Sequence, residues 1–173
     1  MNQQNLAVPP LEKLERIEAI FFDCDGVLTD GGLFYSDSGD RWLKFSAKDG
    51  IGLALWNRAS LKSAIISGRP IDIAQARFSE LGVHAIHGKC HDKEEMVKQV
   101  CRDLNVSPEK SAFVGDDIID LAAFKAVGLR IAVNDAVIEL KEKADWILTS
   151  QGGQGAAREC CETILRAQGK WPY

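Results

Sequence analysis

The spacing of apolar residues switches repeatedly along the chain between that of a β-strand and that of an α-helix. Short runs rich in β-branched and aromatic residues predict buried strands, and each is followed by a segment with the apolar spacing of a helix. The predicted strands span residues 17–22, 61–66, 83–86, 111–114, 129–133 and 145–148. The predicted helices span residues 48–58, 71–81, 91–105, 121–127, 136–143 and 156–167. This alternation predicts a three-layer α/β fold, in which helices wrap a parallel sheet.

A different pattern separates the first strand from the first helix. Two short apolar segments flank Asp37-Ser38-Gly39-Asp40, which predicts a projecting β-hairpin. Leu33, Tyr35, Trp42 and Phe45 are large and apolar for such a hairpin. An isolated hairpin is only marginally stable in water, so we expect these residues to find a partner surface. The alternative is that the hairpin folds back on its own domain.

Length and composition limit the class of protein. The 173 residues fit one domain, which we place at 17–173 after an N-terminal arm at 1–16. A net charge of −4 argues against a nucleic-acid partner, so the positive charge for any anionic ligand must be local. No apolar stretch is long enough to span a membrane, and the spacing of the five cysteines is not that of a disulfide framework. We therefore expect a cytoplasmic protein with no membrane partner.

Chemically active residues follow four of the predicted strands. Asp23 and Asp25 come directly after the first strand, at positions that share one face of an extended chain. Ser67 follows the second strand, Lys93 lies in the helical segment after the third, and Asp116 follows the fourth. Because the carboxyl ends of parallel strands meet at one edge of a sheet, we expect these five side chains to lie close together.

This combination suits phosphoryl chemistry. Asp23 and Asp116 offer the hard oxygen ligands that Mg²⁺ prefers, while Ser67 and Lys93 can hold phosphoryl oxygens. One aspartate can attack phosphorus, and a second can protonate the leaving alcohol. Taken singly, Ser67 and Asp116 have an alternative as helix caps and Lys93 as a solvated helix residue. Their joint occurrence after successive strands favours the chemical interpretation.

These motifs resemble those of the haloacid dehalogenase-like phosphatases over nearly the whole chain. Asp23-Cys24-Asp25-Gly26-Val27 looks like their first motif, Ser67 the second, Lys93 the third and the segment 115–120 the fourth. The resemblance implies a Rossmann-like sheet. Only the hairpin and one helix lie between the first strand and Ser67, which indicates a capless member of the group.

Longer matches resemble one family within this group, the 3-deoxy-D-manno-octulosonate 8-phosphate phosphatases. They cover residues 25–31, 48–50, 66–69, 77, 115–120 and 152–159. The resemblance implies an Mg²⁺-dependent enzyme of lipopolysaccharide precursor synthesis that releases phosphate through an aspartyl-phosphate. It also implies a homotetramer whose hairpins pack together, with a neighbour closing each site. The glycine-rich segment 152–155 on its own predicts a flexible loop.

The resemblance also implies roles for single residues. Asp23 would be the nucleophile and Asp25 the acid/base. Mg²⁺ would be held by Asp23, the backbone carbonyl of Asp25 and Asp116, with support from Asp117 and Asp120. The residues expected to contact substrate are Asp25, Ser46, Ala47, Lys48, Asp49, Gly50, Arg69, Arg77 and Lys93.

Arg69 is our candidate for the carboxylate of a sugar acid, because a guanidinium fork matches a carboxylate. The alternative for Arg77 is a surface helix residue. Three positions depart from the family pattern: Ser67 where threonine is common, His87 where glutamine is expected, and Ala54 where relatives often carry arginine. The last two bear on the identity of the substrate rather than on the reaction.

Three other functions remain open from the sequence. A phosphatase of a nine-carbon sugar-acid 9-phosphate is the first, although Arg69 favours the octulosonate ester. A receiver domain is the second, but it places its lysine last, whereas Lys93 precedes Asp116 here. A non-catalytic tetramerisation module is the third, and it has no need of the acid pair. Trp171 and Tyr173 also suggest that the C-terminal tail enters a neighbouring site.

Overall fold

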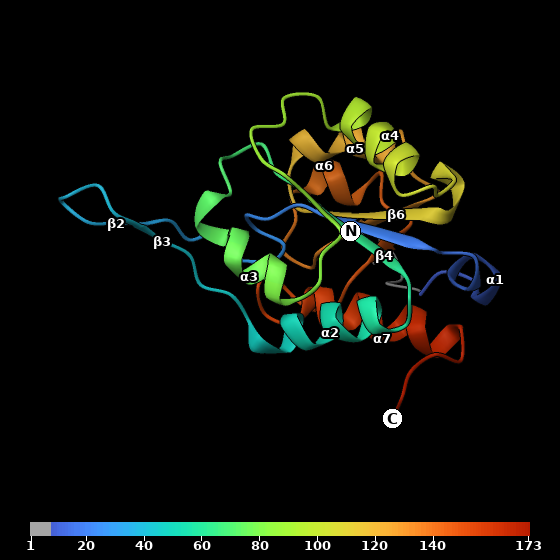
Figure 1. Cartoon of the computed structure of the whole chain (residues 1–173). Helices are drawn as coiled ribbons and strands as arrows, with labels where there is room; N and C mark the ends of the chain where they lie inside the picture. Colours follow the sequence, from blue (N-terminus) through green and yellow to red (C-terminus); the bar gives the residue numbers. More distant parts are fainter. Residues whose placement is uncertain (1–7) are drawn as a thin grey trace.

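A six-stranded parallel sheet forms the centre of the protein, whose computed structural model describes residues 8–173 (Figure 1). The strands are β1 (Ala19–Phe22), β4 (Lys62–Ile66), β5 (Ala85–His87), β6 (Ser111–Gly115), β7 (Leu129–Ala132) and β8 (Trp146–Ile147). They lie in the order β5-β4-β1-β6-β7-β8, and every neighbouring pair is parallel. The first strand of the chain is therefore in the middle of the sheet.

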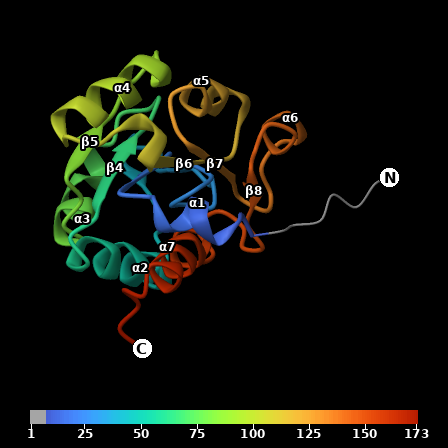
Figure 2. The same ribbon diagram turned by 90° about the vertical axis from the view of Figure 1, so that its right-hand side faces the viewer.

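Helices cover both faces of this sheet. They are α1 (Leu11–Glu15), α2 (Ala47–Arg58), α3 (Gln75–Glu80), α4 (Lys93–Asp103), α5 (Leu121–Phe124), α6 (Ile138–Lys141) and α7 (Ala156–Ala167). Figures 1 and 2 show α2 and α7 side by side on one face, and α4, α5 and α6 on the other. The predicted three-layer, Rossmann-like architecture is confirmed.

The register of β1 aligns the carboxyl ends of the central strands. All four residues of β1 are buried, as expected for a strand with parallel neighbours on both sides. Phe22, its last residue, lies opposite Ile65 of β4 and Val114 of β6. The ladder continues one step further, since Asp23 N–H donates to the carbonyl of Val114 at 3.0 Å. The residue after β1 is thereby tied to β6, directly after a strand that lies between β4 and β6.

The hairpin of β2 (Phe34–Tyr35) and β3 (Arg41–Trp42) projects from the domain, as predicted (Figure 1). Phe34, Tyr35 and Trp42 are each more than half exposed. Only the base of the hairpin returns to the domain, where Phe45 packs edge-on against Phe78 with ring centroids 5.5 Å apart. The alternative that the hairpin folds back on its own domain is wrong for these three residues.

Several element boundaries differ from those that the sequence pattern predicts. The segment predicted as one helix from residue 71 begins with a 3₁₀ turn, Asp72–Ala74. Strand β5 runs to His87, because its ladder with β4 begins opposite Ala64 and extends to Ile66. Within residues 8–173, no helix is both long and apolar enough to cross a bilayer.

Part of the predicted N-terminal arm is a short helix that packs on the domain. Leu14 of α1 is buried, and the amide of Gln168 donates to the carbonyls of Leu14 and Ile17 at 3.1 and 2.7 Å. These contacts tie α1 to the end of α7. Residues 1–7 of the predicted arm lie outside the described residues.

A charged cluster at the amino end of the sheet joins three elements. Asp145, just before β8, accepts hydrogen bonds from the N–H and Nε of Arg130 at 2.9 and 3.0 Å and from its Nη2 at 2.7 Å. Lys13 of α1 lies 3.2 Å from the same carboxylate. Burial opposes ionisation of Asp145, but these partners outweigh it and lower the pKa of its carboxyl to about 2.

We expect Asp145→Asn to lower the free energy of unfolding by about 1–2 kcal/mol at neutral pH, after allowance for solvent screening. A lowered folded-state pKa stabilises the protein above the unfolded pKa, and this stability is lost as the pH falls toward 2. The difference from wild type should therefore shrink to about half by about pH 3. Urea unfolding followed by circular dichroism measures it. An undiminished difference at the lower pH would contradict the assignment.

Candidate active site

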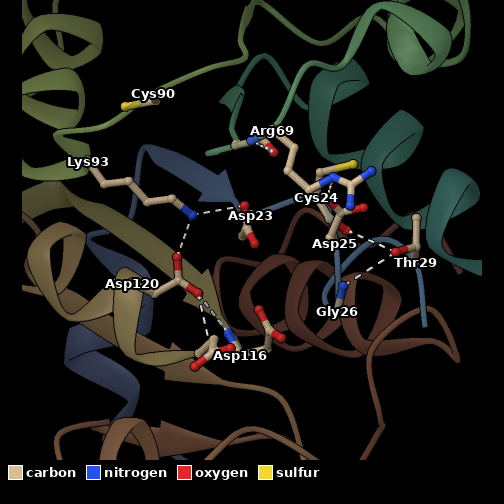
Figure 3. A network of polar contacts seen from close by, with 12 residues as sticks. Asp23, Cys24, Asp25, Gly26, Thr29, Arg69, Cys90, Lys93, Asp116 and Asp120 are labelled. Atoms are coloured by element: carbon tan, nitrogen blue, oxygen red, sulfur yellow. Dashed lines mark hydrogen bonds and ion pairs between the residues drawn. The ribbon is translucent and has the colours of Figure 1, made fainter. Parts of the chain in front are cut away.

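Four of the five predicted catalytic and metal residues line one pocket at the carboxyl edge of the sheet (Figure 3). Asp23 and Asp25 come from the end of β1, Ser67 from the end of β4 and Asp116 from the end of β6. Lys93, at the start of α4, lies behind Asp23 and is buried. The predicted convergence of these side chains is therefore present in the structure.

Lys93 is buried between two carboxylates. Its Nζ lies 2.9 Å from Asp23 Oδ1 and 2.6 Å from Asp120 Oδ1, and only 3% of its side chain is exposed. Burial alone would lower the pKa of Lys93, but the two negative charges outweigh burial and raise it. The ammonium thus remains charged and fixes the nucleophile candidate against the sheet.

Asp120 organises the loop after β6. Its Oδ2 accepts hydrogen bonds from the N–H groups of Asp116 and Asp117 at 2.9 and 3.3 Å, while its Oδ1 faces Lys93. Gly115 makes room for this carboxylate, since a Cβ there would lie 2.5 Å from Asp120 Oδ2. Asp120 therefore acts on the pocket through Lys93 and the backbone of Asp116, and its support of a metal shell stays a prediction.

The acidic side chains around Lys93 suit a divalent cation. Oxygens of Asp23, Asp116 and Asp120 all lie within 4.8 Å of one another. Burial, followed by the charges of Asp120 and Asp23, raises the pKa of Asp116 to about 8. Burial and the charge of Asp120 likewise raise the pKa of Asp23 to about 6, against the effect of Lys93. The single positive charge of the buried ammonium does not balance the negative charge of three carboxylates. The hard oxygen donors and the excess negative charge of this cluster therefore suit Mg²⁺.

A tight turn follows the first aspartate pair, and Thr29 holds it. The Thr29 hydroxyl oxygen accepts hydrogen bonds from the N–H groups of Gly26 and Gly31 at 3.3 and 3.2 Å, and Thr29 has no exposed surface. Gly26 has φ of +83°, and a Cβ there would lie 2.0 Å from Asp116 Oδ2. This role of Thr29 was not predicted, because its only sign in the sequence is a hydroxyl three residues after a glycine.

The glycine-rich segment at 152–155 packs against this turn. Gly153 N–H donates to the carbonyl of Val27 at 2.9 Å. A Cβ on Gly152 would lie 1.7 Å from the carbonyl oxygen of Gly26. Both glycines are buried, so the predicted flexible loop is instead a fixed support, because its glycines allow direct contact between two backbones.

Arg69 stands at the edge of the pocket, beside the second aspartate. Its Nε lies 3.1 Å from Asp25 Oδ2. The hydroxyl of Ser67 accepts the N–H of Arg69 at 3.1 Å, and the carbonyl of Ser67 accepts the N–H of Cys90 at 3.0 Å. The loop after β4 therefore places a hydroxyl and a guanidinium together at the pocket.

The chain is similar in sequence to known proteins. A family model described as haloacid dehalogenase-like hydrolase matches residues 60–159. The 3-deoxy-D-manno-octulosonate 8-phosphate phosphatase KdsC of Haemophilus influenzae is 39% identical over 159 residues, which are 92% of this chain and 88% of that protein. The chain belongs to the 3-deoxy-D-manno-octulosonate 8-phosphate phosphatase family of haloacid dehalogenase-like hydrolases. The resemblance inferred from the sequence motifs is confirmed.

Two solved structures of this phosphatase family share the fold. A cobalt-bound form from Haemophilus influenzae has a TM-score of 0.88 at 39% identity, covering 91% of this chain and 92% of that one. The phosphatase of Moraxella catarrhalis, solved with a magnesium ion, a phosphate ion and a KDO molecule, has a TM-score of 0.90 at 31% identity. It covers 98% of this chain and 95% of that one. Both structures therefore hold a metal, cobalt in the first and magnesium in the second.

The segment that the family resemblance assigns to substrate, Ser46–Gly50, lies beside a second, small hollow between α2 and α3. Ala47 and Lys48 are exposed at the start of α2, and Ser46 caps the helix by accepting the N–H of Asp49 at 3.5 Å. The guanidinium of Arg77 lies over Gly50, where a Cβ would be 2.2 Å from its Nη2. Arg77 thus contacts the predicted substrate segment, and contact with substrate stays a prediction.

Asp49 differs from the other members of this segment. Only 3% of it is exposed, and its two oxygens accept the N–H groups of Gly155 and Arg158 at 3.1 and 3.0 Å. Its carboxylate faces α7 and both of its oxygens are occupied there, and contact of Asp49 with substrate stays a prediction.

His87 and Trp171 are two further residues that the sequence singles out. The backbone carbonyl of His87, at the end of β5, accepts the N–H of Ser67 at 2.8 Å, so residue 87 adjoins the pocket wall, and the effect of its side chain on the substrate stays a prediction. Trp171 packs on its own α7, with its ring centroid 4.7 Å from Arg158 Cζ and 5.1 Å from Arg166 Cζ. Entry of the tail into a neighbouring site stays a prediction.

We expect Gly26→Ala to lower phosphatase activity at least about a hundredfold, because the new methyl group would displace the carboxylate of Asp116. Gly82→Ala is the matched control, since Gly82 has φ of +72° and a Cβ there would meet Asn57 only at 3.9 Å. Both variants carry the backbone strain of about 1–2 kcal/mol. Steady-state rates and thermal unfolding of the pair separate strain from crowding. Equal activity of the two variants would refute the crowding.

Proposed function

We propose that this protein is an Mg²⁺-dependent phosphatase that hydrolyses 3-deoxy-D-manno-octulosonate 8-phosphate to the free sugar acid and phosphate. The observation that carries the proposal is the buried ion pair of Lys93 with Asp23, beside Asp116 in the same pocket. Similarity to named phosphatases over 92% of the chain supports the substrate. The KDO molecule, phosphate and magnesium named in the Moraxella catarrhalis complex support both substrate and cation.

In the proposed mechanism, Asp23 attacks phosphorus and forms an aspartyl-phosphate, while the bond to the sugar oxygen breaks. Asp25 donates a proton to the departing alcohol and then takes one from the water that attacks the phosphoenzyme. Lys93 orients Asp23 through the 2.9 Å ion pair, and Ser67 holds phosphoryl oxygens from the end of β4. Attack by water releases phosphate and restores the carboxylate of Asp23.

The proposed cation ligands are Asp23, Asp116 and the backbone carbonyl of Asp25. When bound, Mg²⁺ supplies positive charge that reduces repulsion between the phosphate dianion and the carboxylates. Asp117 and Asp120 support this group, and Asp120 does so by fixing the N–H of Asp116 at 2.9 Å. The raised pKa values of Asp23 and Asp116 agree with a cluster that needs a further cation.

The proposed substrate contacts lie between the pocket and α2. Arg69, on the pocket edge beside Asp25, would take the carboxylate of the sugar acid. The segment Ser46–Gly50 and Arg77 would contact the remainder of the sugar. A nine-carbon sugar-acid 9-phosphate is the second candidate substrate, because Ala54 and His87 depart from the family pattern on this side.

The proposal includes assembly and cellular context. The projecting hairpin, with Phe34, Tyr35 and Trp42 exposed, supports a homotetramer in which hairpins pack together. The same family membership supports a role in lipopolysaccharide precursor synthesis and a cytoplasmic location. A purely tetramerising module is disfavoured, because it has no use for a lysine buried between two carboxylates.

A substrate panel tests this function. We expect phosphate release from 3-deoxy-D-manno-octulosonate 8-phosphate with kcat/KM at least about tenfold above that for a nine-carbon sugar-acid 9-phosphate, which corresponds to about 1.4 kcal/mol. Removal of Mg²⁺ with EDTA should abolish both rates, and light scattering should give the mass of four chains. Equal or absent turnover of the octulosonate ester would overturn the substrate assignment.

A further inference from the structure

Asp49 joins two helices that are more than one hundred positions apart in the sequence. Its carboxylate leaves the first turn of α2 and accepts two N–H groups at the start of α7, those of Gly155 and Arg158. The N-cap position of α7 is Gly155, at φ of +109°, which has no side chain to cap the helix itself. Asp49 therefore supplies the cap that α7 lacks.

The two helices touch at backbone level beside this cap. A Cβ on Gly52 would lie 2.7 Å from the Cα of Arg158 and 3.3 Å from the carbonyl oxygen of Ala157. Figures 1 and 2 show α2 and α7 running side by side along one face of the sheet. With no side chain between them, the start of α2 cannot move without moving the start of α7.

The start of α7 in turn supports the catalytic turn. Gly155 directly follows the segment whose glycines press on the backbone after β1. Gly153 N–H donates to the carbonyl of Val27 at 2.9 Å. A Cβ on Gly152 would lie 1.7 Å from the carbonyl oxygen of Gly26, so the two backbones are in direct contact. The path from Asp49 through Gly155 to Gly26 is therefore continuous along the backbone, and Asp49, Gly152, Gly153 and Gly155 on it are buried.

We propose that Asp49 is a positioning residue that fixes the substrate-recognition segment Ser46–Gly50 relative to the catalytic turn at Asp23–Gly31. The inference rests on the proposed function, because it assigns recognition of the sugar acid to the start of α2. Asp49 acts through the N–H groups of Gly155 and Arg158 and does not itself touch substrate. Its loss separates recognition of the sugar from cleavage of the phosphate ester.

Two substrates distinguish these activities. The octulosonate ester requires both the recognition segment and the catalytic turn, whereas p-nitrophenyl phosphate requires only the phosphoryl pocket. Asp49→Asn places an amide NH₂ against a backbone N–H in place of one oxygen, so one of the two hydrogen bonds is lost. We expect KM for the octulosonate ester to rise at least about tenfold, with the rate on p-nitrophenyl phosphate changing less than about twofold.

Hydrogen exchange of the ligand-free protein separates positioning from direct contact. In Asp49→Asn, we expect faster exchange at the N–H groups of Gly153 and Gly155 and in the peptide covering Gly26–Gly31. Loss of a direct substrate contact alone would leave these amides unchanged. Asp145→Asn is the matched control, because it also removes a carboxylate held by several hydrogen bonds but lies at the amino end of the sheet. It should leave the ratio of the two activities unchanged.

The outcomes are separable. Equal loss of both activities in Asp49→Asn, or unchanged exchange at Gly26–Gly31, would overturn the positioning role. If Asp49→Asn does not fold, Asp49→Ser, which keeps one acceptor oxygen, takes its place. A wild-type enzyme that cleaves p-nitrophenyl phosphate but not the octulosonate ester would refute the proposed function alone, and the exchange measurement would still decide the role of Asp49.

Discussion

The buried ion pairs of Lys93 are the interaction on which the pocket depends. Its ammonium lies 2.9 Å from Asp23 and 2.6 Å from Asp120, with almost no contact with water. Removing one partner of a buried pair leaves an uncompensated charge, which costs about 3–5 kcal/mol. Because Asp120 also holds the N–H of Asp116, the same lysine connects the loops after β1 and β6. One cation among three carboxylates is too little charge for balance, and this shortage supports the proposal that the pocket binds Mg²⁺.

Glycines carry the second constraint, which is close approach of backbones around the catalytic turn. Gly26 allows the carboxylate of Asp116 beside the turn, and Gly152 allows the turn to rest on the loop before α7. Gly52 does the same where α2 meets α7. These contacts leave no room for side chains. The catalytic acids are therefore held in place by close packing within the domain itself, without a separate cap domain.

The sequence was sufficient for the features that depend on local order. The alternation of strands and helices was enough to predict the parallel sheet. The positions of Asp23, Ser67 and Asp116 directly after strands were enough to predict the pocket, because parallel strands share one carboxyl edge. The sequence was insufficient for Asp49 and Thr29, since a buried acid that caps a distant helix and a hydroxyl that holds a turn look like ordinary polar residues. Their partners are set by tertiary packing, which no local pattern records.

The central claim is that Asp23 is the nucleophile held by Lys93, and Asp23→Asn tests it most directly. The amide is nearly isosteric but does not attack phosphorus, so turnover of the octulosonate ester should fall by at least about a thousandfold. Light scattering and circular dichroism should show the wild-type assembly and fold. Unchanged phosphatase activity in a folded Asp23→Asn variant would contradict the mechanism.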